Sequence, residues 1–162
     1  MITQEYLKVL LTYDLTSGLF TWNFSKSNVV KKGEIAGSIT GYGYREIMID
    51  GKSYPASKLA VLYVTGIYPS KVDHINTVTT DDSYSNLRLA DKYQNNWNRS
   101  ISSANTTGIK GLSWNKQNRW CCKLTCKGKT MVRYFKTNEK DIAIKWLQET
   151  RQSLHGGFTN HG

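Results

Sequence analysis

Proline, cysteine and long apolar runs are scarce in this sequence. Only two prolines and three cysteines occur among 162 residues. A membrane-spanning helix needs about 18 consecutive apolar residues, and no such run is present. The N-terminus lacks the basic start and the apolar core of a signal peptide, so we expect a cytoplasmic protein. Composition therefore excludes secreted, collagen-like and integral-membrane classes.

The three cysteines, Cys121, Cys122 and Cys126, lie close together. An odd number of cysteines in a cytoplasmic chain argues against a disulfide framework. A zinc site would need further ligands, and the candidates, His155 and His161, are distant in the sequence. We therefore expect the cysteines to be small apolar residues of a strand, with a zinc site as the less favoured alternative.

Acidic residues are scarce in the last part of the chain. Residues 1–100 carry 11 basic and 9 acidic side chains, whereas residues 101–162 carry 11 basic and 3 acidic ones. Eight lysines and arginines and no acidic residue lie between Lys110 and Lys136. A formal net charge of +10 indicates a polyanionic partner, most often nucleic acid. Because the polar stretch 99–107 resembles a linker, we expect two domains, 1–100 and 101–162.

The second domain contains three segments rich in strand-forming residues. In the middle segment, apolar and polar side chains alternate, which places them on opposite faces of a sheet. The expected strands are 109–115, 119–126 and 130–136, separated by turns at 116–118 and 127–129.

An apolar stripe over 138–154 predicts a helix that covers one face of this sheet. The other face would be exposed and basic, and a sheet of this kind can enter a DNA major groove. We expect that face to carry Lys123, Thr125, Lys129, Met131 and Arg133.

The motifs of residues 105–157 resemble the APETALA/ethylene-response-factor type of DNA-binding domain, in its phage and bacterial form. The resemblance rests on a Gly-apolar-x-Trp opening, Trp120, Gly128-Lys129, Phe135 and the trailing helix. It implies a three-stranded antiparallel sheet packed on one helix, with the sheet reading duplex DNA. The implied DNA-binding residues are Lys110, Ser113, Asn115, Lys123, Thr125, Lys129 and Arg133.

The first domain has weaker patterns. Residues 3–11 and 57–65 favour short helices, and 19–23 favours a strand. The stretch 44–56 reads as a β-hairpin around Gly51-Lys52. A polar string, 72–100, follows.

That polar string contains Asp73 next to His74, then Asn86 and Asn95. A neutral imidazole can take a proton from water near neutral pH. A carboxylate and an amide oxygen are ligands that Mg²⁺ accepts, and two protein ligands leave positions for phosphate oxygens. The same residue types are also common in loops, where Asp-His-Ile-Asn can form a turn.

Residues 15–99 resemble phage HNH homing endonucleases. The resemblance rests on YDLTSGLFTW, GYGYREIMIDGKSYPASKLA, VDHIN and SNLR. It implies a ββα-metal nuclease fold in which a β-hairpin and a helix hold one Mg²⁺, or another divalent cation such as Mn²⁺. The implied general base is His74, and Asn86 is the residue that braces its loop. The implied metal ligands are Asp73 and Asn95. Asn96 and Asn98 are alternatives to Asn95.

The sequence departs from that family at two places. Ser57 stands where relatives usually have His, and the loop 77–83 replaces a Gly-Asp or Gly-Asn turn. We therefore expect an α+β fold and a metal-dependent DNA endonuclease of the homing type that can nick duplex DNA. We expect no membrane partner. The alternative is a DNA-binding regulator of the same fold with weak or no cleavage.

Overall fold

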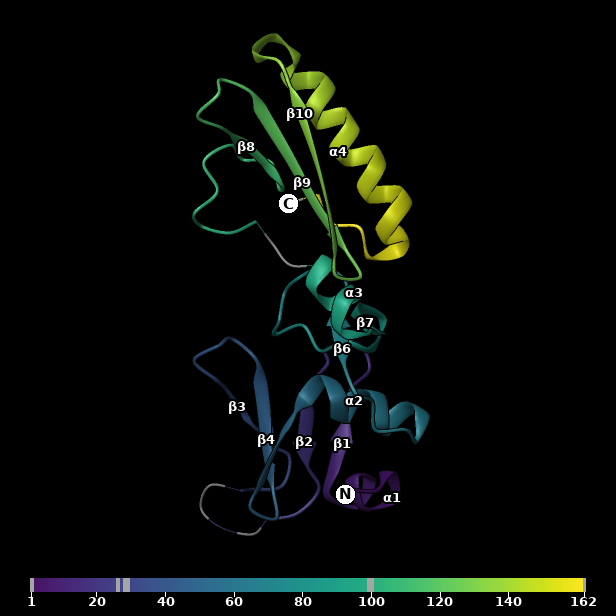
Figure 1. The fold of residues 1–162 in the computed structure, drawn as a ribbon. Coiled ribbons are helices and arrows are strands. Elements are labelled where there is room, and N and C mark those ends of the chain that lie inside the picture. The colour runs from purple at the N-terminus through teal and green to yellow at the C-terminus, as the bar shows by residue number, and fades with distance from the viewer. Residues whose placement is uncertain (1, 26, 28–29, 99–100, 162) are drawn as a thin grey trace. The chain divides into compact units, whose positions relative to one another are not determined.

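The structure is a computed structural model that describes residues 2–25, 27, 30–98 and 101–161 (Figure 1). The chain forms two compact units, Met1–Asp91 and Lys92–Gly162, which we call the N-terminal and the C-terminal unit. The division falls earlier than the boundary expected near residue 100. The reason is that Trp97 packs in the C-terminal unit, where its ring stacks on that of His155 with centroids 4.4 Å apart.

The N-terminal unit begins with a helix and a two-stranded sheet. The hydroxyl of Thr3 caps helix α1 (Gln4–Leu10) by accepting a 3.2 Å hydrogen bond from the backbone N–H of Tyr6. Strands β1 (Leu11–Tyr13) and β2 (Phe20–Trp22) then pair antiparallel. Helix α1 and strand β2 both lie within the segments expected from the sequence.

A three-stranded antiparallel sheet and a second helix follow. The sheet consists of β3 (Ser38–Ile39), β4 (Arg45–Ile49) and β5 (Lys52–Pro55), in that order. Helix α2 (Ala56–Thr65) starts directly after β5 and ends at Gly66, whose φ of 77° suits a left-handed helix cap. The expected β4–β5 hairpin and the expected helix are both present.

The core of the N-terminal unit combines residues of α1, α2 and the strands. Leu7, Leu11, Phe20, Ile47 and Leu59 are fully buried in one cluster. Burial of apolar surface stabilises a fold by about 25 cal/mol per Å². This cluster is therefore the main source of stability of the unit, and the polar segment that follows packs against it.

That polar segment forms a short antiparallel pair, β6 (Val72–His74) and β7 (Leu87–Leu89), joined by a loop that ends in the 3-10 turn η1 (Tyr84–Asn86). Leu87 lies opposite His74 and packs against the core cluster, as does Tyr84. The loop between the strands is thus fixed to the core at its C-terminal end.

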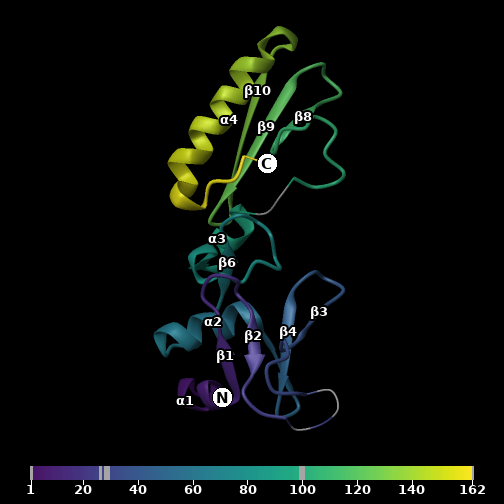
Figure 2. The same cartoon turned by 180° about the vertical axis from the view of Figure 1, so that it is seen from behind.

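The C-terminal unit is a three-stranded antiparallel sheet with one long helix. The strand order is β10-β9-β8, and helix α4 packs on one face of the sheet (Figures 1 and 2). Leu112, Cys122, Leu124, Phe135 and Leu147 form its core. The elements are α3 (Lys92–Trp97), β8 (Leu112–Trp114), β9 (Trp120–Cys126), β10 (Lys129–Phe135), η2 (Thr137–Glu139), α4 (Lys140–His155) and η3 (Gly156–Phe158).

One expectation for this sheet is wrong. Lys129, Met131 and Arg133 do not share the face of Lys123, because the turn contains two residues, Lys127 and Gly128, and β10 starts at Lys129. Lys129 therefore pairs with Cys126, Met131 with Leu124 and Arg133 with Cys122, on the side that α4 covers. Side chains alternate along a strand, so a shift of one residue exchanges the two faces.

The fold is mixed α+β, with small antiparallel sheets and a C-terminal helix, as expected. Within the described ranges, none of the helices has the length and apolar character that a bilayer crossing requires.

Candidate functional site

His74 pairs with a carboxylate that the sequence analysis did not single out. Its Nε2 atom lies 2.8 Å from Oδ1 of Asp82, and both side chains are buried. Asp82 belongs to the loop between β6 and β7, eight residues further along the chain. Its second oxygen, Oδ2, is also buried and has no hydrogen-bond partner within the described part of the chain. The acidic doublet Asp81-Asp82 was visible in the sequence, but nothing in its pattern assigned it to His74.

Asp73 forms an ion pair with Arg88, its partner across the β6–β7 pair. The Nη2 atom of Arg88 lies 2.7 Å from Oδ2 of Asp73, and Nε donates to the same oxygen at 2.8 Å. Both contacts fall on Oδ2, so Oδ1 takes no part in the ion pair. Sequence analysis missed the role of Arg88, because strand register decides which side chains face each other.

Asn86 closes the loop that follows His74. Its Oδ1 accepts a 3.0 Å hydrogen bond from the backbone N–H of Asn76, and its Nδ2 donates at 2.8 Å to the carbonyl of Asp81. The backbone carbonyl of Asn86 also accepts from the N–H of Ile75 at 2.9 Å. One asparagine therefore joins both ends of the segment between His74 and Asp82.

Two further contacts hold this loop against the rest of the N-terminal unit. The hydroxyl of Tyr13 donates a 2.7 Å hydrogen bond to the carbonyl of Asp82. At a second point of the loop, the hydroxyl of Thr79 donates at 2.8 Å to the carbonyl of Gly43, next to Tyr44. The ring of Tyr44 lies 6.2 Å from that of His74, centroid to centroid. The loop is thus held at two points, Thr79 and Asp82, by hydrogen bonds to the rest of the N-terminal unit.

Local hydrogen bonds and burial set the ionisation of two groups at the loop, the Asp81 carboxyl and the Tyr13 phenol. Hydrogen bonds from the Ser83 hydroxyl and backbone and from the Asn76 amide hold the pKa of the Asp81 carboxyl below its usual range. Burial, reinforced by the negative charge of Asp82, raises the pKa of the Tyr13 phenol well above its ordinary value. Tyr13 therefore stays a neutral hydrogen-bond donor at neutral pH.

The prediction of Asn95 as the second metal ligand falls outside the described side chains. The side chains of Asn95 and Asn96 lie outside the described residues, and helix α3 belongs to the C-terminal unit. The other alternative, Asn98, is buried in that unit, where its carbonyl accepts a 2.7 Å hydrogen bond from Asn160.

Two carboxylate oxygens of the β6–β7 segment are of the type that a hard divalent cation accepts, but Asp73 and His74 are neighbours on β6, so their side chains point to opposite faces of the strand. Asp73 Oδ1 is outside the ion pair, and Asp82 Oδ2 is a buried carboxylate oxygen without a hydrogen bond from any described residue. Magnesium and manganese ions prefer such oxygen ligands. Among the described residues, no three histidine, cysteine or acidic side chains lie together as a metal site.

The exposed face of the C-terminal sheet carries three of the predicted DNA-binding residues. Ser113, Lys123 and Thr125 have exposed side chains on this face, opposite the one that α4 covers. The strand register adds four side chains to them. The exposed sheet face thus consists of Ser113, Cys121, Lys123, Thr125, Thr130, Val132 and Tyr134.

Three of the other four predicted DNA-binding residues, Asn115, Lys110 and Arg133, have structural contacts. Asn115 forms the β8–β9 turn, where its Oδ1 accepts hydrogen bonds from the backbone N–H groups of Gln117 and Arg119, both at 3.0 Å. The ammonium group of Lys110 donates at 2.9 Å to the carbonyl of Trp97. The guanidinium of Arg133 lies over the rings of Phe135 and Trp146, and Lys129 is exposed at the start of β10 on the same side. Arg119, which was not predicted, lies 5.0 Å from the ring centroid of Tyr134.

The cysteines are free thiols in different environments. Cys122 is fully buried in the C-terminal core, and burial raises the pKa of its thiol to about 11. It is a small apolar residue of the core, as expected. Cys121 lies on the opposite face, and the Sγ atom of Cys126 donates a weak 3.9 Å hydrogen bond to the carbonyl of Leu154.

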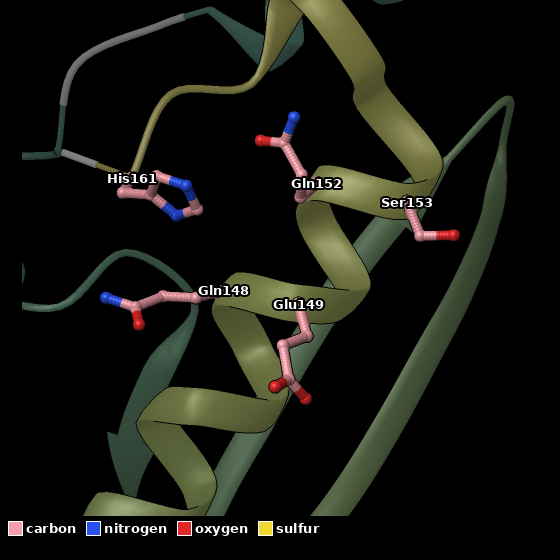
Figure 3. A pocket seen from close by; sticks show the side chains of 5 residues that line it. All are labelled: Gln148, Glu149, Gln152, Ser153 and His161. Atoms are coloured by element: carbon pink, nitrogen blue, oxygen red, sulfur yellow. The ribbon is translucent and has the colours of Figure 1, made fainter.

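A pocket of about 560 Å³ lies along helix α4 (Figure 3). Polar side chains line it, and none of them belongs to the predicted nuclease or DNA-binding residues. The lining residues are Gln148, Glu149, Gln152, Ser153 and His161.

The fold and the His74 loop define a two-unit α+β protein with a histidine–carboxylate pair on a short β-hairpin. The chain is 38% identical over 88 residues to Protein 3.8 of Escherichia phage T7, an alignment that covers 54% of this chain and 71% of that protein. The chain therefore belongs to the same family as Protein 3.8. No family model matches the chain, and no solved structure matches it.

Proposed function

We propose that this chain is a phage-encoded, metal-dependent endonuclease that hydrolyses phosphodiester bonds of duplex DNA in the host cytoplasm. The observation that carries the proposal is the pairing of His74 with buried Asp82 on a hairpin loop that Asn86 closes. A histidine fixed in this way is suited to general-base catalysis. The phage relative supports the proposed origin.

The proposed chemistry begins at His74, which takes a proton from a water molecule near the scissile phosphate. The resulting hydroxide attacks phosphorus, and the 3′ oxygen leaves. Asp73 would contribute a ligand to Mg²⁺, or Mn²⁺, which when bound supplies positive charge to the phosphate oxygens. Asn86 keeps the His74 loop in one shape, so the imidazole does not have to be ordered before each reaction.

The C-terminal unit would bind the DNA. Its exposed sheet face is basic because Lys123 lies on it and no acidic residue occurs between Lys110 and Lys136. Arg119 adds a second cation beside Tyr134. Neutralisation of phosphates by such side chains gives salt-dependent affinity. We therefore propose an HNH-type nuclease unit joined to an ethylene-response-factor-like binding unit.

A second candidate function is a DNA-binding regulator that does not cut. The ion pair between Asp73 and Arg88 favours it, because one predicted metal ligand already has a cationic partner. Such a protein would bind duplex DNA tightly and with strong salt dependence, and added Mg²⁺ would not lead to nicking.

Incubation of supercoiled plasmid with the full-length protein separates the two candidates. The endonuclease converts the plasmid to open circles when Mg²⁺ is added and stops when the metal is chelated. His74→Ala should lower the rate roughly 100- to 10,000-fold while DNA binding is retained. His161→Ala, which removes an exposed histidine of the C-terminal unit, serves as the matched control. Binding without nicking by the wild-type protein would favour the regulator.

A further inference from the structure

Asp82 is the buried acid next to His74, and the reaction steps proposed above do not say how it acts on the imidazole. Its side chain is 3% exposed, and the ring of His74 is its only hydrogen-bonding partner within the described part of the chain. The Tyr13 hydroxyl holds the carbonyl of the same residue, so the position of this carboxylate is fixed from the core.

Stability alone does not explain a carboxylate at this position. Its Oδ2 atom is buried without a hydrogen bond from any described residue, and burying an unpaired acceptor is unfavourable. A fully apolar or fully satisfied side chain would stabilise the loop better. Buried groups that cost stability are often retained for function.

The contact fixes the protonation of the imidazole. An ionised carboxylate only accepts hydrogen bonds, so the 2.8 Å contact requires that Nε2 of His74 carries the hydrogen. In the neutral ring the lone pair is then on Nδ1. When Nδ1 takes a proton, the ring becomes a cation, and the adjacent carboxylate of Asp82 stabilises that charge.

We propose that Asp82 is a positioning residue for the nuclease reaction, which keeps the hydrogen of His74 on Nε2 so that Nδ1 accepts the proton from water. This role rests on the proposed function of His74. Water gives its proton to Nδ1, its oxygen forms the new bond to phosphorus, and the bond from phosphorus to the 3′ oxygen breaks with its electron pair. Solvent protonates the leaving oxygen, and the imidazolium returns its proton to solvent, while Asp82 remains ionised throughout.

Nitrogen-15 NMR of the ring nitrogens in the full-length protein at pH 8 tests the contact without reference to activity. The wild-type protein should show a hydrogen on Nε2 of His74 that resonates at low field and exchanges slowly with water. Asp82→Ala should abolish that slow, low-field resonance, whereas Asp82→Asn, whose amide oxygen still accepts but carries no charge, should shift it to higher field and speed its exchange. Asp50→Asn, the same change at an exposed carboxylate of the N-terminal unit, should leave it intact.

Plasmid nicking gives the second readout. Asp82→Asn should lower the nicking rate roughly 10- to 100-fold, with DNA binding unchanged and with a free energy of unfolding equal to or above that of the wild type. Asp82→Asn is nearly isosteric, so it keeps the measurement valid if Asp82→Ala fails to fold.

The outcomes separate the two claims. A wild-type His74 with its hydrogen on Nδ1, or a variant that nicks as fast as the wild type, overturns the role of Asp82 and leaves the nuclease standing. A wild-type protein that never nicks overturns the proposed function and the catalytic role of Asp82. The NMR experiment still shows in that case whether Asp82 holds the hydrogen on Nε2 of His74.

Discussion

The hydroxyl of Tyr13 donates a 2.7 Å hydrogen bond to the backbone carbonyl of Asp82. The Tyr13 ring stacks on that of Phe20, with centroids 4.6 Å apart, so the tyrosine is itself part of the core. One side chain therefore connects the core of the N-terminal unit to the loop that carries the partner of His74.

Removal of the Tyr13 hydroxyl should lower the stability of the protein. In Tyr13→Phe the ring still fills the core, but the buried carbonyl of Asp82 loses its donor, so the free energy of unfolding should fall by about 1–3 kcal/mol. The nicking rate should fall as well, because Asp82 is less well placed. Urea denaturation of the full-length protein measures the first effect. Tyr6→Phe is the matched control, since the exposed Tyr6 hydroxyl donates to Asp50 at the surface. Equal losses in the two variants would contradict the role of Tyr13.

Gly18 should tolerate no side chain. Its φ is 73°, and a Cβ atom there would lie 2.2 Å from the backbone of Asp82 and Ser83. Gly18→Ala should therefore lower the free energy of unfolding by about 3 kcal/mol or more, from backbone strain and from the clash together. Gly51 has a similar φ of 74° with nothing near its Cβ position, so Gly51→Ala should cost only about 1–2 kcal/mol. If the two alanine variants lose the same stability, close packing of the loop against Gly18 is refuted.

Lys123 should contribute to DNA affinity through phosphate contact. Lys123→Ala should weaken binding about equally on all sequences and reduce the slope of log K against log salt by about 0.9. Lys145→Ala removes an exposed lysine of helix α4, away from the exposed sheet face, and should leave the slope unchanged. Fluorescence anisotropy with labelled duplex DNA at several salt concentrations measures both. A larger loss for Lys145→Ala would place the DNA on the helix instead.

The C-terminal unit should become less stable in mild acid. Burial lowers the pKa of His155 below its ordinary 6.5, and the positive charges of Arg151 and Lys110 act in the same direction. The unfolded chain then binds the proton more readily than the folded one, so stability is present above pH 6.5 and is lost as the pH falls below it. Thermal unfolding at pH 7.5 and 5.5 should show this decline. His155→Phe keeps an aromatic ring against Trp97 and should make the decline smaller; a decline as steep as that of the wild type would show that other groups cause it.

Periodicity in the sequence was sufficient to predict the elements that bury an apolar face. The strand 119–126 and the helix 138–154 correspond to β9 and α4, because alternation and the apolar stripe follow directly from which side chains must be buried. The faces of β10 could not be predicted in the same way. They depend on whether the turn holds two or three residues, and Lys129 is compatible with both the turn and the strand.

The contacts of the candidate site around His74 could not be predicted from the sequence either. The residue types alone indicate Asp73, His74 and Asn86 as candidates. They do not indicate which side chains these residues contact. Asp82 reaches His74 through the path of an irregular loop, and Arg88 reaches Asp73 through strand register. Neither relationship leaves a repeat or a fixed spacing in the sequence, so only the three-dimensional arrangement reveals it.

The most direct test of the nuclease proposal is the initial rate at which the wild-type protein and His74→Ala nick supercoiled plasmid in Mg²⁺, at protein concentrations that give equal DNA binding. We predict that the wild type nicks, that chelation of the metal stops it, and that the variant is slower by roughly 100-fold or more. Equal rates for the two proteins would show that His74 is not the general base.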